Sequence, residues 1–575
     1  MSNNKKSFLN GYDIAFAILF AVSLLFVLWK CRYGYGNADE AFYLSTTYRV
    51  FNGDAMITED WHLAQLFAFF SYPMMKIYFM FATSTEGIFL VFRRICVITQ
   101  ALVSLYTYLR LRKENKLGAL ICGLFVILYL PFGLMFLNYN NLGFFSMVIC
   151  CVTLFTAKKN IILQAAVSGF FYAIAVVNCP YLFALYIFYV IYSIIAKIFK
   201  LRKGDPVFSF DGVFGVTAGG AILALAFGAF ILSRSTVDDI VTALPWIMED
   251  PTHWSNAWYT YFYDYFKSVV FDSSRRINAT IVLYSAIGIL LLAEIIDPKR
   301  KKHRGIYYTG AAGVVSLLVV NYCYTDRFPN LVIFPLNLLA LFPIICGDAD
   351  QKAKDAFVKI WIPGMVYSFI NNMSSNQHYY VISSASAVAS VGTILIMSYS
   401  IDNWLKEFNL KDRKAFLKLV YSVPVLSFIF VSCVYLCCIV FLRYYHIFWD
   451  TPIRNQNKLI TVGPEKGLYV SEYFENWYLD RWNYYQGQDL KEGERVIISD
   501  DVVLYLIDGI RCGCFSVWPI NDGNADMHKA YFDMNPHMLP ERVYIQDGRA
   551  FPCEWFASEY GYSMTHEGSL TILTK

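Results

Sequence analysis

Long apolar stretches alternate with short polar segments from about residue 10 to residue 442. Each stretch approaches the roughly 20 residues that a helix needs to cross a hydrocarbon core of about 30 Å. The pattern predicts a mainly α-helical polytopic membrane protein with about thirteen transmembrane helices. The first span has no small-residue cleavage site after it and is expected to be retained. The expected spans are residues 13–30, 87–109, 117–137, 142–157, 161–178, 181–197, 211–233, 279–296, 306–323, 331–347, 356–373, 381–399 and 419–442.

Basic residues concentrate in the connections on one side of these spans. With the N-terminus inside, they lie in residues 110–116, 158–159, 197–203, 299–304, 352–354 and 406–414. The short connections on the other side, at 138–141, 178–180 and 374–380, contain no Lys or Arg. Because basic loops stay cytoplasmic, we expect a multi-pass protein of the cell membrane with a cytoplasmic N-terminus and an extracytoplasmic C-terminus.

Residues 61–81 are apolar enough to be mistaken for a further span. Counting them would move the basic connections at 110–116 and 299–304 outside, against the charge rule. We therefore place this segment in the outer interface, as amphipathic or re-entrant helices. Residues 1–442 then form the membrane domain, with two long outer loops at 31–86 and 234–278.

The composition changes after Leu442. Short strand-like runs alternate with helix-like ones, which is typical of a small α/β domain over residues 443–575. The expected strands lie in residues 458–462, 495–499, 515–518, 542–545 and 571–573, and an amphipathic helix is expected over 472–485.

Composition supports a lipid environment and excludes one class of partner. Of 575 residues, 57% are hydrophobic and 16% charged, against about 25% charged in a soluble domain. The net charge of +4 comes from residues scattered between spans, not from a basic face, so we expect no nucleic-acid partner.

Asp39 and Glu40 are adjacent carboxylates just after the first expected span. Such a pair in a loop is usually solvated surface. At the membrane boundary, however, partial dehydration raises a carboxyl pKa, and the group can meet both a lipid headgroup and a soluble acceptor. The pair is therefore the leading candidate for catalysis.

Three further motifs accompany this pair within residues 10–350. They are Arg93-Arg94 at the start of the second span, Tyr139-Asn140-Asn141 between the third and fourth spans, and Arg327-Phe328-Pro329 before a late span. Together they resemble the GT-C superfamily of membrane glycosyltransferases, and within it the branch of protein O-mannosyltransferases and aminoarabinose transferases. The last motif has Phe328 where that branch usually has Tyr, and Pro329 directly follows.

The resemblance implies transfer of a sugar from a polyprenyl-phosphate donor to a glycan, lipid or protein acceptor, with inversion. Asp39 would be the general base, and Glu40 would orient it or bind the acceptor, or the two roles are exchanged. Cations would stabilise the leaving phosphate, although each is also explained as a snorkelling residue at the interface. The candidate cations are Arg327, Arg93, Arg94, Lys76, His378, Arg275 and Arg276; Tyr139, Asn140 and Asn141 would line the acceptor cavity. No cofactor is required and no metal site is indicated, although some relatives use a divalent ion.

Other classes of membrane protein remain open. A transporter or lipid flippase usually places ionisable residues at mid-membrane depth, whereas the expected spans are nearly free of charge at their centres. An envelope glycan polymerase or ligase usually carries arginines and a histidine in large late outer loops, and the late loops here are short. A non-catalytic scaffold is the third alternative.

Overall fold

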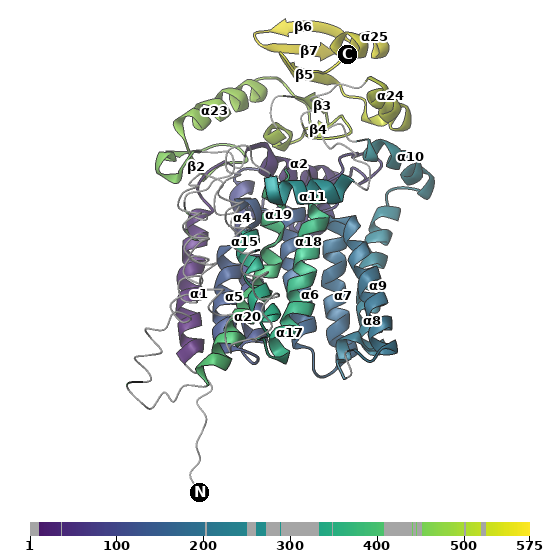
Figure 1. Ribbon diagram of the computed structural model, residues 1–575. Coiled ribbons are helices and arrows are strands. Elements are labelled where there is room, and N and C mark those ends of the chain that lie inside the picture. Colours follow the sequence, from purple (N-terminus) through teal and green to yellow (C-terminus); the bar gives the residue numbers. More distant parts are fainter. Residues whose placement is uncertain are drawn as a thin grey trace.

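The structure is a computed structural model. It describes residues 11–35, 37–201, 204–249, 260–271, 333–347, 349–375, 377–406, 451–499, 502–518 and 525–575, with the single residues Gly288, Lys414, Val440 and Tyr444. The described part consists of a helical bundle with strands gathered beyond one end of it, and the first described helix begins at the other end (Figure 1).

Six described helices are long and apolar enough to cross a membrane, and a pair bent by 49° passes the same test together, as a broken span or a re-entrant loop. The six are α1 (Gly11–Lys30), α4 (Ile88–Leu111), α6 (Tyr139–Thr156), α7 (Ile161–Asn178), α8 (Phe183–Ile198, preceded by the 3-10 turn Pro180–Leu182) and α9 (Phe210–Leu232); the pair is α19 (Tyr379–Ala385) with α20 (Ala387–Leu405). The six helices confirm six expected spans, and the bent pair coincides with the span expected over 381–399. The total of about thirteen is not confirmed, and the spans expected at 279–296, 306–323 and 419–442 lie outside the described residues, apart from two single positions.

The span expected over 117–137 is wrong beyond Leu128. Helix α5 (Lys116–Leu128) ends early, because Pro131 has no backbone N–H to continue it. A 3-10 turn, Pro131–Gly133, follows, with Phe132 at the left-handed φ of 56°. The chain therefore runs irregularly from Tyr129 to Asn138, where the Asn138 side chain caps α6 by accepting a hydrogen bond from Asn141 N.

Two other expected spans are built from shorter pieces. Residues 331–347 contain α15 (Ile333–Leu338) and α16 (Leu341–Ile345), and residues 356–373 contain a π-helical turn (Phe357–Trp361) between α17 (Gln351–Ala356) and α18 (Ile362–Met373). Asn337 joins these pieces to α20, because its amide donates to Ser386 O (2.7 Å) and its side-chain oxygen accepts from Ser390 (2.9 Å). A polar side chain inside the bundle is thus satisfied by its neighbours.

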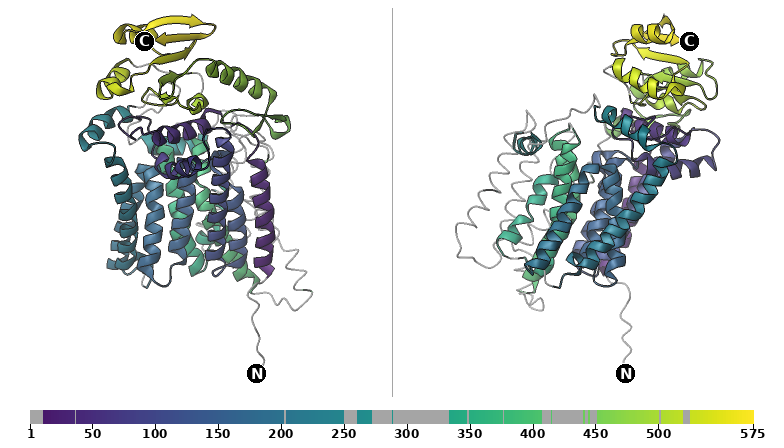
Figure 2. Two further views of the ribbon diagram at one scale, coloured as in Figure 1. Left: turned by 180° about the vertical axis from the view of Figure 1, so that it is seen from behind. Right: turned by 90° about the vertical axis from the view of Figure 1, so that its right-hand side faces the viewer.

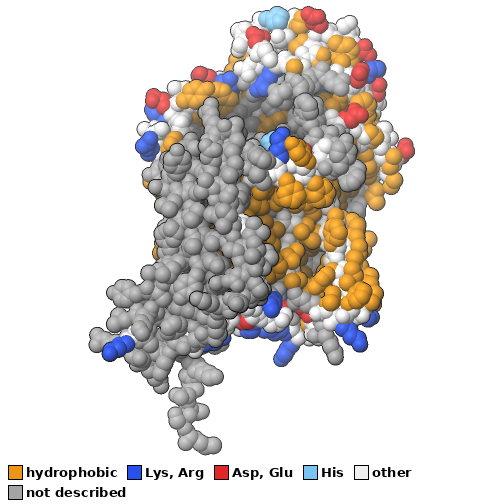
Figure 3. All heavy atoms as spheres, in the orientation of Figure 1, with side chains coloured by type: hydrophobic (Ala, Val, Ile, Leu, Met, Phe, Trp, Pro, Cys, Tyr) orange, Lys and Arg blue, Asp and Glu red, His pale blue; other side chains and the backbone are white. Residues whose placement is uncertain are grey.

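Small residues allow close packing within the bundle. A Cβ at Gly219 of α9 would lie 1.8 Å from Ala166 O of α7, and one at Gly169 would lie 2.0 Å from Val216 O. Such small-residue contacts are typical of helix pairs in membranes. The outward sides of the helices are apolar, as the hydrophobic band between the two ends of the molecule shows (Figure 3).

Four shorter helices lie across one end of the bundle (Figures 1 and 2). They are α2 (Asn37–Phe51), α3 (Ala68–Phe79), α10 (Val237–Met248) and α11 (Thr260–Phe271). At 12 residues, α3 is shorter than the roughly 20 residues of a span. This agrees with the expectation that residues 61–81 do not cross the membrane.

The C-terminal region carries a mixed five-stranded sheet in the order β4-β3-β5-β7-β6. The strands are β3 (Arg495–Ile498), β4 (Arg511–Cys512), β5 (Arg542–Gln546), β6 (Ser563–Glu567) and β7 (Leu570–Thr574), with helices α23 (Glu472–Gln486), α24 (Ala525–Met534) and α25 (Cys553–Tyr560); β1 (Lys458–Leu459) and β2 (Tyr469–Val470) pair separately. Five expected elements are confirmed. The strand expected over 515–518 is wrong, because Phe515 O accepts instead from Trp61 N (2.7 Å) of the first outer loop.

Buried charges join the C-terminal region to α2 and the loop after it. Arg49 pairs with Asp54 (2.7 Å) and donates to the Tyr531 hydroxyl (3.0 Å), while Arg495 reaches Asp54 at 3.4 Å. Asp60 lies 3.7 Å from Arg49, and burial raises its pKa to about 6 against the opposing pull of that arginine. The sheet is therefore held firmly above the ends of the helices.

Charged residues also gather at the opposite end of the bundle. Glu114 pairs there with Lys158 and, at 3.4 Å, with Lys352, and Arg112 pairs with Asp13 at 3.2 Å. These basic residues belong to connections expected inside. The direction in which the bundle crosses the membrane stays a prediction.

Candidate functional site

Asp39 lies in the first turn of α2, at the end of the bundle that carries the C-terminal sheet. The linker from α1 reaches it through Gly34, which has a φ of 85° and donates to Tyr469 O at 2.8 Å. Asp39 is only partly exposed. Burial, and secondarily the charge of Glu40, raises the pKa of Asp39 from 3.8 to about 7. The group can therefore exchange a proton near neutral pH.

Glu40 is buried and fully engaged. One carboxylate oxygen accepts from Arg93 Nε at 2.9 Å, and the other accepts from Met135 N at 2.7 Å. Arg93 also donates to Gly34 O (2.7 Å) and Cys31 O (3.1 Å). Arg93 therefore holds both the linker before α2 and the carboxylate beside Asp39.

Asn141 supports the same arrangement from α6. Its amide donates to Leu134 O and Phe136 O, both at 2.6 Å, and these residues flank Met135. Because Met135 N donates to Glu40 of α2, the irregular segment after α5 connects α6 to α2 through hydrogen bonds. Tyr139, Asn140 and Asn141 form the first turn of α6 instead of a separate turn.

Two tyrosines face one another beside the acidic pair. The rings of Tyr43, one turn after Asp39 on α2, and Tyr139 meet edge to face with centroids 5.9 Å apart. Burial first, and then the nearby Tyr139 and Asp39, raise the pKa of the Tyr43 hydroxyl well above its usual value. Tyr139 and Asn140 are partly exposed, whereas Asn141 is buried. Tyr139 is thus the member of its motif that the structure places beside the acidic pair.

The candidate cations are scattered. Lys76 is exposed on α3, with its ammonium 4.7 Å from the Tyr72 ring, and Arg94 is exposed near the start of α4. His378 is exposed before α19, with a φ of 48°. Arg327, Arg275 and Arg276 lie outside the described residues. Arg93 is the one described cation that the structure brings to the acidic pair, and it is paired there.

Arg234 is a further cation at this end that sequence reasoning missed. It donates to Val50 O (2.9 Å), Asp54 O (3.1 Å) and the Tyr72 hydroxyl (3.1 Å). An arginine immediately after the span expected to end at residue 233 was the signal available. Within the described ranges, no group of three or more His, Cys, Asp or Glu side chains could hold a metal ion.

No protein-family model and no curated protein matches the chain. Among solved structures, the oligosaccharyltransferase AglB of Archaeoglobus fulgidus, in complex with an inhibitory peptide and a dolichol-phosphate, is 13% identical over 93% of this chain and 70% of its own, with a TM-score of 0.44. The apo form of the Archaeoglobus fulgidus enzyme is 12% identical over 93% and 69%, also at 0.44. The same enzyme tethered to an acceptor peptide is 12% identical over 92% and 69%, at 0.41. TM-scores this low carry no argument about family or activity.

Proposed function

We propose that this chain is a glycosyltransferase of the GT-C type, which moves a sugar from a polyprenyl-phosphate donor to an acceptor at the outer face of the cell membrane. The observation that carries the proposal is Asp39: a partly buried carboxylate, with its pKa raised to about 7, at the end of a bundle of helices long enough to cross a membrane. Burying a carboxylate costs folding free energy, and a pKa near neutral pH allows the group to take up and release a proton as a general base does.

The reaction would proceed by a single displacement. Asp39 takes the proton from the acceptor hydroxyl while that oxygen bonds to the anomeric carbon from the face opposite the phosphate. The bond from the anomeric carbon to the phosphate oxygen breaks, and its electron pair leaves with the lipid phosphate. The sugar is inverted, and the products are the glycosylated acceptor and the polyprenyl phosphate.

The surroundings of the two carboxylates favour Asp39 over Glu40 as the base. Both Glu40 oxygens accept hydrogen bonds, one from a buried guanidinium and one from a backbone amide, so both are already engaged within the protein. In this scheme Glu40 and Arg93 are positioning residues that fix the start of α2. The leaving phosphate would meet the exposed Arg94 or Lys76, or Arg327, since arginine matches phosphate oxygens well.

The remaining parts of the proposal follow from the sequence. Residues 1–442 form the membrane domain and residues 443–575 an extracytoplasmic α/β domain, with the N-terminus in the cytoplasm. We propose that the donor is a single hexose or pentose on polyprenyl phosphate, by analogy with the branch of protein O-mannosyltransferases and aminoarabinose transferases. The acceptor is a glycan, a lipid or a protein.

The test is transfer in proteoliposomes from polyprenyl-phosphate donors that carry labelled hexoses or pentoses. Asp39→Asn keeps the shape of the side chain but cannot take a proton, and loss of a general base costs about 10²–10⁴ in rate. Donor binding, measured separately, should stay near normal. The matched control is Asp238→Asn, an exposed carboxylate in the first turn of α10, which should keep its activity. Full transfer by Asp39→Asn would remove the proposed base.

A further inference from the structure

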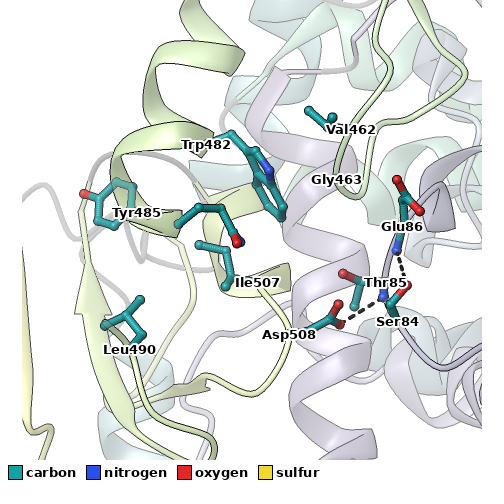
Figure 4. Close-up of a pocket in the computed structure, with 11 residues that line it drawn as sticks. Ser84, Thr85, Glu86, Val462, Gly463, Trp482, Tyr485, Leu490, Ile507 and Asp508 are labelled. Carbon is teal, nitrogen blue, oxygen red and sulfur yellow. Dashed lines mark hydrogen bonds between the residues drawn. The ribbon is translucent and has the colours of Figure 1, made fainter. Parts of the chain in front are cut away.

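A cavity of about 430 Å³ lies between the loop before α4 and the C-terminal region (Figure 4). This volume is within the range of ~300–1,000 Å³ typical of small-molecule sites. One wall comes from the loop before α4 together with Asp508 in the turn after Leu506, and the opposite wall comes from α23. Its lining includes Ser84, Thr85, Glu86, Trp482, Gln486 and Asp508.

Trp482 forms an aromatic wall that is held in place. Its ring stacks on Tyr478 with centroids 5.9 Å apart and planes 13° apart, and the Tyr478 hydroxyl donates to Val462 O at 3.2 Å. Gly463 has a φ of 70°, and a Cβ there would lie 2.2 Å from the Tyr478 hydroxyl and 2.9 Å from the Trp482 ring. Only glycine therefore fits beside these rings, and the indole is presented without rearrangement.

The facing wall is acidic. Asp508 accepts from Thr85 N at 2.9 Å, and the Thr85 hydroxyl donates to Leu506 O at 2.6 Å. Glu86 pairs with Lys466 at 3.1 Å, and both side chains are exposed. Asp508 has no ion pair among the described residues, so the cavity carries excess negative charge and repels an anionic lipid phosphate.

The geometry points to a neutral carbohydrate as the ligand: we propose that this cavity binds an uncharged oligosaccharide segment against Trp482, Asp508 and Glu86. The apolar face of a sugar ring packs on an indole, while its hydroxyls donate to carboxylates and exchange hydrogen bonds with the Ser84 hydroxyl and the Gln486 amide. An aromatic platform facing hydrogen-bonding side chains suits a ligand that is apolar on one face and polar at its edge.

The cavity is joined to the acidic pair through α4. Glu86 lies two residues before this helix, and Arg93 of the same helix contacts Glu40 directly. We therefore include an acceptor role for the bound oligosaccharide in the proposal. Its use as an acceptor rests on the proposed function, whereas binding itself does not.

The experiment measures binding of defined trisaccharides to the full-length protein in nanodiscs, by ligand-observed NMR. Maltotriose, mannotriose and chitotriose are the neutral probes, and trigalacturonate is an anionic probe of similar size. At least one neutral probe should bind, and trigalacturonate should bind at least tenfold more weakly because of Glu86 and Asp508.

Variants locate the binding. Trp482→Ala should weaken binding roughly fivefold to tenfold through lost stacking, and Trp482→Phe should restore part of it. Asp508→Asn should weaken binding with little change in shape. Tyr473→Ala, which removes an aromatic ring of the same helix that is 78% exposed and outside the cavity, should have no effect.

The outcomes are decisive in either direction. Absence of binding by all three neutral probes, equal binding of trigalacturonate, or unchanged affinity in both Trp482→Ala and Asp508→Asn would overturn the proposal. Asp39→Asn serves to separate the two hypotheses. If Asp39→Asn binds the trisaccharide but does not transfer sugar, both the proposed base and the binding site are supported. If Asp39→Asn transfers sugar fully and still binds the trisaccharide, the proposed base is refuted and the binding site stands.

Discussion

The pH dependence of sugar transfer is the most direct consequence of the environment of Asp39. Burial raises its pKa from 3.8 to about 7, and the base acts only when deprotonated. Transfer should therefore be maximal above pH 7 and fall as the pH decreases through 7. At pH 5 only about 1% of a base with a pKa of 7 is ionised, whereas an unperturbed aspartate would remain more than ~90% ionised. The two environments thus differ about 100-fold at pH 5.

The assay is kcat/KM for sugar transfer between pH 5 and pH 9, because this parameter reports the free protein. Glu40→Gln supplies the perturbation, since it removes the neighbouring negative charge and leaves the Arg93 cation uncompensated. Both changes lower the Asp39 pKa, so the acid limb should move to lower pH. Breaking a buried pair costs stability, so the double variant Glu40→Gln with Arg93→Gln serves as a neutral replacement. Its acid limb should stay nearer that of the unaltered protein.

An acid limb near pH 4 in the unaltered protein would refute this reasoning, because it would mean that Asp39 is as solvated as an ordinary surface aspartate. An acid limb that moves to higher pH in Glu40→Gln would refute the assumed sign of the interaction. Stability must be followed in parallel across the same pH range. A loss of transfer that tracks unfolding would not count as titration of the base.

Three other predictions concern different parts of the molecule. Gly219→Val should prevent α7 and α9 from packing closely and lower the yield of folded protein on size exclusion. Gly228→Val should be neutral, because no atom lies within 4 Å of a Cβ at that position. Equal yields of the two variants would refute the contact. His528 is fully buried, and neither of its ring nitrogens has a hydrogen-bond partner among the described residues. Because an unpaired buried polar group costs ~1–3 kcal/mol, His528→Phe should raise the melting temperature. Burial lowers the pKa of His528 from 6.5 to about 3; the unaltered protein therefore loses stability as the pH falls below 6.5, and the variant should lose less. Arg93→Lys should lower kcat with little change in the KM for the donor, and a selective rise in that KM would instead indicate a phosphate ligand.

Several elements were predictable because their causes are local. Six spans follow from length and composition alone, because in lipid a helix satisfies all of its backbone hydrogen bonds within one segment. Helix α23 was predictable from the helical spacing of its apolar residues, and strands β3, β5 and β7 from short runs rich in β-branched residues. The early end of α5 could have been read from Pro131, which removes a donor wherever it stands.

The candidate site was predictable only in part. The sequence by itself singled out Asp39 and Glu40, because adjacent carboxylates after a first span are conspicuous, and it named Arg93 only as one of seven candidate cations for the phosphate. Only the tertiary structure joined Arg93 to Glu40 across 53 residues and placed Asp39 where burial raises its pKa. It also assembled the cavity from four distant segments. Ion pairing and desolvation depend on every atom within a few ångströms, whatever its position in the chain, so local sequence patterns do not determine them.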